Sequence, residues 1–306
     1  MAVATQSPSS THTPDDIVRD VKNLPSAPRV LPRLKSLLSD GNSVMSDIVA
    51  LVRLDPGIAA RVLQTSNSAY FSGGLRCDTV YEAVKRVGYD QIYDLVAYAV
   101  ASQVLVRPLD AYGIEADELW KRSVACALAT EALAERTAQD RDAAYTVGLL
   151  HCVGMVALDE WSLRGGRKLT FRSEGMPREA VASERAALGF TQAEVGGALL
   201  RDWQFTTDTS EAVRWQYTPR LAGVSQPMAG LLHVAKWIRS TVCAPAADQP
   251  PPLPDAIYLK PLGVDAAALS AMADSVRRRL EEVSSVLDTT PKAPERHRFP
   301  GQPARF

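Results

Sequence analysis

The sequence predicts an all-α fold built from many short helices. Apolar residues recur at spacings of three and four along most of the chain, and no segment shows the strict alternation that is typical of a half-buried strand. Helix start signals accompany this pattern: Asp55 precedes Pro56, and Thr191 stands three residues before Glu194, which is the spacing of a capping box. With 306 residues, of which 46% are hydrophobic, the chain can bury one large core or two modest ones.

The composition excludes several classes of function. Lys and Arg number 34 and Asp and Glu number 35, so the formal net charge of -1 gives no overall attraction to nucleic acid or to an anionic membrane. No apolar run has the length of a membrane span and the first residues lack a signal-peptide pattern, so we expect a cytoplasmic protein without membrane contact. The absence of CxxC spacing favours a reducing compartment for the four cysteines, which are Cys77, Cys126, Cys152 and Cys243.

A first helical group is predicted over about residues 14–110. The preceding residues 1–13 are rich in Ser, Thr and Pro, which predicts a disordered N-terminus. Helices then follow at short intervals: Ser46 is the expected cap of one, and Thr79 begins another that ends at the next glycine. A further amphipathic helix is expected over residues 92–103, because its apolar residues share one face.

A second helical group is predicted over residues 111–243. An alanine-rich helix begins near Asp117, and Pro177 opens another helix at its first turn. Between them, residues 143–158 are predicted to form one buried helix, because apolar and small residues dominate the whole stretch. The remaining helices of this group are expected at residues 191–200, 210–217 and 227–242.

The C-terminal part consists of a Pro-rich stretch, a helix and a basic tail. Residues 244–256 are predicted to form a linker or a stiff loop, and residues 257–288 carry a long amphipathic helix with Asp265 at its cap. The tail at residues 289–306 is expected to be disordered. Three arginines at 277–279 make this part basic, but two glutamates follow them directly. We interpret the arginines as a solvated helix face and expect no nucleic-acid binding.

Several blocks of residues occur in a distinctive order. Residues 24–28 read LPSAP, residues 52–69 contain Asp-Pro and Asn-Ser-Ala, and residues 82–89 read EAVKRVGY. Later blocks lie at residues 119–123, 148–154, 189–196 and 211–217. Together these blocks resemble the HDOD family of bacterial signalling modules, which is related to the HD and HD-GYP metal phosphohydrolases. The resemblance spans most of the chain and implies an HD-like helical bundle with an N-terminal group of short helices. The resemblance also implies a family in which most members have no demonstrated enzymatic activity.

The resemblance also locates the metal position of an active HD enzyme, and the ligands are missing there. Arg122 stands in place of the first histidine, and Cys152 stands in place of the aspartate that would follow His151. Gln192 and Gln216 stand where HD-GYP enzymes carry further histidines. Arg122 is in addition a permanent cation directed at the same place. We therefore expect no catalytic residue, no bound metal and no cofactor.

A different metal site would use the remaining soft ligands. Cys126, Cys152, His151 and His233 have the ligand types that suit Zn²⁺, but the cysteines lack a local chelating spacing. We interpret Cys126 and Cys152 as small core residues and His151 as a buried remnant that is hydrogen-bonded to a neighbour.

A candidate contact region follows the Asp-Pro start. Asp55 is expected to cap a helix, and Asn67 to end it through side-chain-to-backbone hydrogen bonds. Tyr70 and Phe71 form an aromatic pair beside a Gly-Gly turn and serve either as a core anchor or as an exposed contact. The functional alternative assigns all four residues to a surface that a partner or ligand contacts.

These observations favour a non-catalytic signal-transduction or regulatory module that acts through contact with an unidentified signalling protein. The family resemblance implies motility or stress response as its setting. One alternative is a degenerate metal-dependent phosphohydrolase or phosphodiesterase that uses His151. A second alternative is a nucleotide-sensing domain in which Arg122 and Arg214 hold an anionic ligand in the former catalytic cleft. The sequence leaves the partner, the pathway and the oligomeric state open.

Overall fold

The structure, a computed structural model, describes residues 12–21, 33–34, 37, 43–88, 91–92, 108–171, 177–244 and 251–288. These residues form helices and loops without a β-strand, apart from an isolated bridge between Leu109 and Ile114. The predicted all-α fold is therefore confirmed. Outside the described residues lie residues 1–11, the block at 24–28, most of the helix expected at 92–103, residues 245–250 of the Pro-rich stretch and the basic tail.

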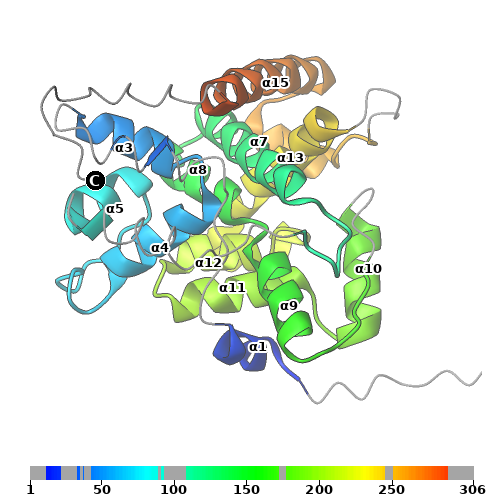
Figure 1. Ribbon diagram of the computed structural model, residues 1–306. Coiled ribbons are helices and arrows are strands. Elements are labelled where there is room, and N and C mark those ends of the chain that lie inside the picture. Colours follow the sequence, from blue (N-terminus) through cyan, green and yellow to red (C-terminus); the bar gives the residue numbers. More distant parts are fainter. Residues whose placement is uncertain are drawn as a thin grey trace, which may run out of the picture.

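Three short helices form a group at one side of the molecule (Figure 1). They are α3 (Met45–Val52), α4 (Pro56–Asn67) and α5 (Val80–Val87). Their starts follow the predicted signals in two cases. The Asp55 side chain accepts a hydrogen bond from the Ile58 amide at 2.9 Å, and Thr79 accepts one from the next turn of α5. The prediction for Ser46 was wrong: α3 begins at Met45, and no side chain caps it.

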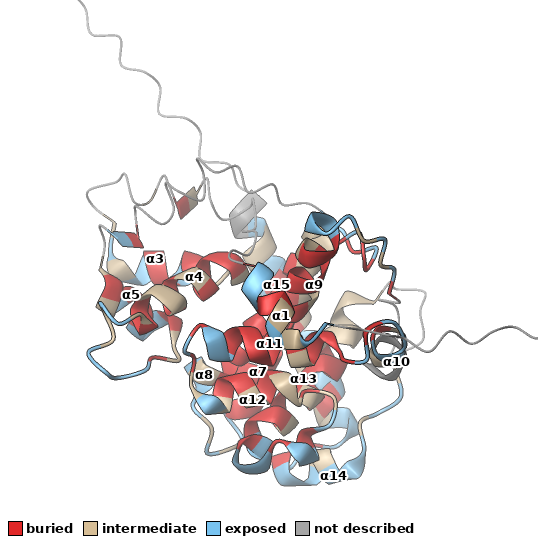
Figure 2. Ribbon diagram, turned by 90° about the horizontal axis from the view of Figure 1, so that it is seen from below, coloured by how far each residue is buried: buried red, intermediate tan, exposed pale blue. Residues whose placement is uncertain are grey.

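The larger group surrounds two long helices, α7 (Ala116–Ala134) and α13 (Gln226–Cys243), which pack against each other and are largely buried (Figure 2). Among the described residues, no helix combines the length and apolarity that crossing a membrane requires. The helices that complete this group are α8 (Arg141–Leu150), α9 (Val153–Arg164), α10 (Pro177–Leu188), α11 (Gln192–Asp202), α12 (Thr207–Arg214), η1 (Pro219–Leu221), η2 (Gly223–Ser225), α14 (Ala256–Leu259) and η3 (Lys260–Leu262).

The single helix predicted over residues 143–158 is in fact two helices. Helix α8 ends at Leu150 and α9 begins at Val153, so His151 and Cys152 form the bend between them. Glycines on both sides of this bend allow close packing. A Cβ atom at Gly148 would clash with Thr130 Oγ1 and lie 2.7 Å from the Ala127 Cα of α7. A Cβ atom at Gly154 would clash with the backbone of α11. The bend is therefore held tightly between α7 and α11.

Helix α1 (Pro14–Asp20) packs on α9 and α11, which are far from it in sequence (Figure 1). Thr13 forms a capping box with Asp16, and the His12 ring lies 5.1 Å from the Trp161 ring, edge to face. Residues 12 and 13 therefore belong to the folded part, which begins slightly earlier than the predicted disordered segment implies.

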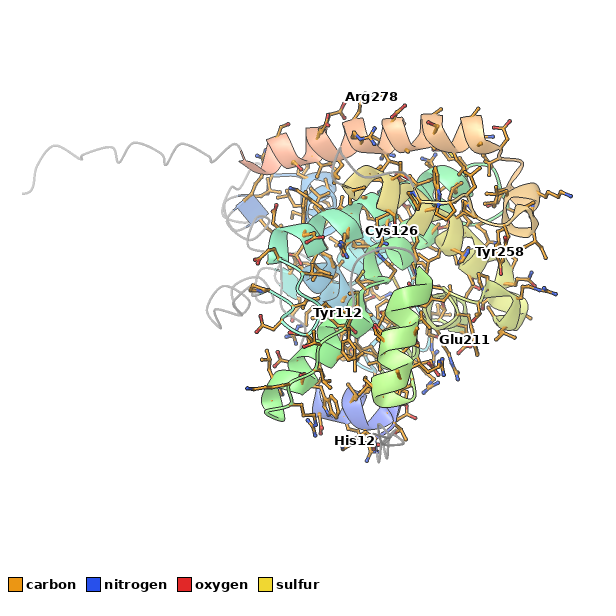
Figure 3. The ribbon with its side chains drawn as sticks, turned by 90° about the vertical axis from the view of Figure 1, so that its right-hand side faces the viewer. His12, Tyr112, Cys126, Glu211, Tyr258 and Arg278 are labelled. Atoms are coloured by element: carbon orange, nitrogen blue, oxygen red, sulfur yellow. The ribbon has the colours of Figure 1, made fainter. Side chains whose placement is uncertain are left out.

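Helix α15 (Ala266–Asp288) lies across α7 and α13 (Figure 1). Its predicted cap is present, since Asp265 Oδ1 accepts a hydrogen bond from the Ala268 amide at 2.8 Å. Arg279 Nη2 lies 2.9 Å from Glu131 Oε2 of α7, whereas Arg278 points away from the bundle (Figure 3). The arginine run therefore contributes partly to docking this helix.

The close packing at Gly148 predicts a strong and position-specific effect of added volume. Gly148→Ala should lower the free energy of unfolding by about 2–3 kcal/mol, because the new methyl group overlaps Thr130 and the α7 backbone. Gly230→Ala is the matched control, since a Cβ atom at that helical position in α13 meets nothing within 4 Å. It should raise the free energy of unfolding by about 0.5–1 kcal/mol through better helix propensity. Urea unfolding measures both, and equal effects would contradict the packing argument.

Candidate functional site

His151 lies at the centre of a buried polar site. Its Nδ1 atom is 2.7 Å from the Gly148 carbonyl oxygen, so Nδ1 carries the proton and donates it there. The other ring nitrogen, Nε2, is then the acceptor. It lies 3.0 Å from Cys152 Sγ and 3.4 Å from Arg239 Nη1, both of which can donate a hydrogen bond. The nitrogen that would face a metal is thus already engaged by a thiol and a guanidinium.

Both members of the His151–Cys152 pair are electrically neutral. Burial lowers the pKa of His151 well below its ordinary value, and the positive charges of Arg239 and Lys236 lower it further. Burial raises the pKa of the Cys152 thiol, although the same cations oppose this shift. A neutral imidazole next to a protonated thiol offers little attraction to a divalent metal ion, which needs a thiolate or carboxylate.

Gln216 connects the bend to helix α13. Its Nε2 atom donates to the His151 carbonyl oxygen at 3.1 Å and to the Val213 carbonyl oxygen at 3.0 Å. Its Oε1 atom accepts a hydrogen bond from Lys236 Nζ at 2.9 Å. Gln216 follows α12 directly, so this side chain joins three segments of the second helical group.

Lys236 is a buried amine with a neutral hydrogen-bond partner. Lys236 is 3% exposed, and its Nζ atom lies 3.3 Å from the centre of the Tyr217 ring, over the face of the ring. Within the described part of the chain, no carboxylate forms an ion pair with it. Burial first, and then the charge of Arg239, lower the pKa of Lys236 well below its ordinary value.

Two further cations complete the surroundings of His151. Arg239 follows Lys236 by one helical turn and donates to Ser240 Oγ at 3.0 Å, while its buried Nε has no hydrogen-bond partner among the described residues. Arg122 of α7 pairs with Glu118 on its own helix, and its charge lowers the pKa of both His151 and Cys152.

Gln192 bonds to the hydroxyl of Tyr217, whose ring Lys236 covers, and begins a second buried chain of hydrogen bonds. Its Nε2 atom donates to Tyr217 Oη at 2.7 Å, and its backbone amide donates to Glu184 Oε2 at 2.8 Å. The Tyr112 hydroxyl donates to the other oxygen of Glu184 at 3.0 Å. Burial raises the pKa of Glu184 to about 7, although both hydrogen bonds oppose the shift.

The structure brings together four of the predicted residues of the former metal site. Arg122, His151, Cys152 and Gln216 surround one position, and Gln192 connects to it through Tyr217. The sequence analysis missed Lys236 and Arg239. Both fit the ordinary period of helix α13 and belong to no motif, so only the packing of α13 against the bend reveals them.

Arg214 pairs within its own helix, and Cys126 and Cys152 are buried, as predicted for core residues. The Arg214 guanidinium lies 3.6 Å from Glu211 and over the Trp215 ring, and it is not among the charges that shift the pKa of His151 most. The part of the chain that is described contains no group of three or more His, Cys, Asp or Glu side chains that could hold a metal ion. His233 instead faces the Gln216 carbonyl oxygen and the Tyr258 ring. Cys126 is buried beneath α15, as a core residue would be (Figure 3).

Asp55 and Asn67 lie beneath the candidate contact region and bond to backbone groups there. Both are fully buried, so neither can meet a partner directly, and this corrects their assignment to a contact surface. Asn67 Oδ1 accepts a hydrogen bond from the Cys77 amide at 2.7 Å, and its Nδ2 donates to the Cys77 carbonyl oxygen at 3.0 Å. The amide group therefore closes the loop at residues 68–79, which contains Tyr70 and Phe71.

The tip of this loop presents apolar side chains to solvent. Tyr70 is 88% exposed, with the Phe71 ring packed edge-on against it at 4.8 Å, and Leu75 is 72% exposed. The base of the loop is fixed to the second helical group, because Arg76 Nη1 donates to the Phe205 carbonyl oxygen at 3.0 Å. We name the three loop residues Tyr70, Phe71 and Leu75 the apolar patch.

Comparisons with known proteins agree with this fold. The family model described as HDOD domain matches residues 24–219. An uncharacterized protein of Treponema pallidum (strain Nichols) is 28% identical over 201 residues, which are 64% of this chain and 38% of that protein. The chain thus spans well under half the length of this relative.

Two solved structures share the fold. The MmoQ response regulator from Methylococcus capsulatus str. Bath aligns with a TM-score of 0.62 and 21% identity, covering 82% of this chain and 98% of that chain. A virulence factor from Campylobacter jejuni aligns with a TM-score of 0.62 and 17% identity, covering 88% of this chain and 100% of that chain. At these identities the likeness establishes the fold alone.

The raised pKa of Glu184 predicts a pH-dependent stability. The folded state holds this proton more tightly than the unfolded chain does, so the stabilisation is complete below about pH 4.5 and is lost as the pH rises through about 7. The total change is on the order of 3 kcal/mol. In Glu184→Gln this dependence should disappear, whereas the exposed control Glu281→Gln should keep it. Urea unfolding at several pH values measures the difference from the original protein, and a difference that stays constant from pH 5 to 8 would refute the assignment.

Proposed function

The chain belongs to the HDOD family, and from this premise we propose that it is a non-catalytic signal-transduction or regulatory module that acts through protein–protein contact. The proposal has two parts. The former metal position serves as an internal scaffold, and the apolar patch on the N-terminal group serves as the contact surface.

The engagement of His151 Nε2 carries the first part of the proposal. A metal ion at this nitrogen would have to displace the Cys152 thiol and the Arg239 guanidinium, which lie 3.0 and 3.4 Å away. It would also stand among the positive charges of Arg122, Lys236 and Arg239, which repel a divalent cation. The replacements at Arg122 and Cys152 remove ligands as well. These features together oppose phosphohydrolase chemistry at this position.

The apolar patch supports the second part. Exposed aromatic side chains contribute strongly to protein interfaces, because they bury a large area at low cost in conformational entropy. Here they project from a loop whose ends are fixed by Asn67 and Arg76, so binding a partner would order few additional residues. The fitting partner is a protein with an apolar pocket or groove that accepts Tyr70 and Leu75.

The metal content of the protein tests the scaffold. Protein purified without a metal-affinity step should contain iron, manganese and zinc at well below one equivalent per chain by plasma mass spectrometry. His151→Ala should leave these values unchanged, since the imidazole already bonds within the protein. Near-stoichiometric metal that is lost in His151→Ala would overturn the proposal and revive the phosphohydrolase alternative.

A surface substitution tests the contact. A tagged chain would be isolated from its native host, and the copurifying protein identified by mass spectrometry and produced separately. Tyr70→Ala should weaken its binding by about 2 kcal/mol, roughly 30-fold in Kd, as for an aromatic residue at the centre of an interface. The melting temperature should not change, because Tyr70 is 88% exposed.

The matched control for this substitution is Ile257→Ala, which removes an exposed apolar side chain from α14, away from the apolar patch. It should leave binding unchanged in calorimetry. Equal binding by the original protein and Tyr70→Ala would remove this surface from the proposal.

A further inference from the structure

Three basic side chains surround the bend at His151 and Cys152. Lys236 and Arg239 lie one turn apart on α13, and Arg122 lies on α7, which packs directly against α13. All three charges lower the pKa of His151, and Arg239 and Lys236 also act on the thiol of Cys126, one turn after Arg122. We name Arg122, Lys236 and Arg239 the cationic cluster.

The cationic cluster has little negative charge to balance it. Glu118 pairs with Arg122 at the edge of the cluster, and the charge of Glu184 acts on Lys236 without forming an ion pair with it among the described residues. Lys236 donates to a neutral amide oxygen, and Arg239 bonds to a hydroxyl and to a neutral imidazole. Within the described residues neither of these two forms an ion pair, and the buried Nε of Arg239 has no acceptor at all. Burial without a counter-charge lowers the pKa of Lys236, and an anion that binds beside it would raise this pKa again and stabilise the ammonium form, so the site favours the arrival of an anion.

The donors indicate the class of anion. A guanidinium presents parallel N–H groups that match two oxygens of a phosphate, and an ammonium adds a third donor as a point charge. The position also limits the size of the ligand. Lys236 is 3% exposed, whereas the Arg122 side chain is 18% exposed and Arg239 is half-buried. The basic side chains thus extend from the surface to the interior. A small anion can reach the buried ones, whereas the surface of a macromolecule cannot.

We propose that the cationic cluster is a binding site for a phosphate group, either inorganic phosphate or a small phosphate monoester, held by Lys236 and Arg239 with Arg122 at its edge. The basic side chains of this site attract an anion, whereas the ligands of a metal centre at the same position would attract a cation. It is separate from the apolar patch, and the proposed contact function does not depend on it.

Thermal unfolding at constant ionic strength tests the site. The full chain is prepared without phosphate or sulfate, and phosphate then replaces chloride in steps. The unfolding midpoint should rise with the logarithm of the phosphate concentration above Kd, by about 3 °C at a concentration ten times Kd, because phosphate binds the folded state. Equilibrium dialysis with radiolabelled phosphate should give about one site per chain. Adenosine monophosphate in a parallel titration separates the two sources: a tighter Kd than that of phosphate indicates a monoester ligand.

Variants assign the effect to the cluster. Lys236→Met and Arg239→Gln should abolish the phosphate-dependent shift, whereas the exposed controls Lys260→Met and Arg220→Gln should keep it. In phosphate-free buffer Lys236→Met should also melt at or above the temperature of the original protein, because an apolar side chain replaces a buried amine whose charged form burial disfavours. This result shows in addition that the variant folds.

Two outcomes would overturn the proposal. One is an original protein that binds no labelled phosphate and shows no shift beyond that of the chloride-matched sample. The other is a shift that both cluster variants retain. Tyr70→Ala should keep the full phosphate-dependent rise in the unfolding midpoint. A failure of the proposed partner contact can therefore be distinguished from a failure of the proposed phosphate site.

Discussion

The close approach of the α8–α9 bend to α7 and α11 is the constraint on which the rest of the site depends. Gly148 and Gly154 allow this approach, since a side chain at either position would overlap the neighbouring helix. With the bend held in place, His151 is directed away from solvent. Its ring faces Arg239 of α13, and its carbonyl oxygen faces Gln216. The polar site is thus a consequence of backbone packing, and its side chains satisfy groups that the bend exposes inside the protein.

Gln216 shows how the polar interior around the bend remains stable. One amide side chain donates to two backbone carbonyl oxygens and accepts from Lys236, so it bonds on both sides. A histidine at this position could not make all three bonds, because it has two ring nitrogens. These hydrogen bonds therefore hold the bend, the segment after α12 and α13 together.

The sequence allowed prediction of features that depend on local chemistry. The caps at Asp55 and Thr191 follow from side chains that bond to the next turn, and both are present. The break at His151 was missed because neither proline nor a polar cap marks it. For Asp55 and Asn67 the sequence favoured structural roles but left a contact surface open as the alternative, because a polar side chain beside a helix end looks the same in sequence whether it bonds inward or outward. Lys236 was missed for a related reason: a lysine at helical spacing gives no sign that its ammonium is buried.

Glu131 shows that this protein can neutralise buried arginine charge where its fold requires it. This carboxylate is 6% exposed and accepts Arg53 at 2.6 Å on one oxygen and Arg279 at 2.9 Å on the other. It thereby joins the N-terminal group, α7 and α15 through a compensated charge cluster. The cationic cluster lies nearer the start of α7, where this helix packs against α13, and no comparable carboxylate forms an ion pair with Lys236 or Arg239 from the described residues. The difference between these two sites is the argument that the missing negative charge belongs to a ligand, because a purely structural site could have been balanced as Glu131 is.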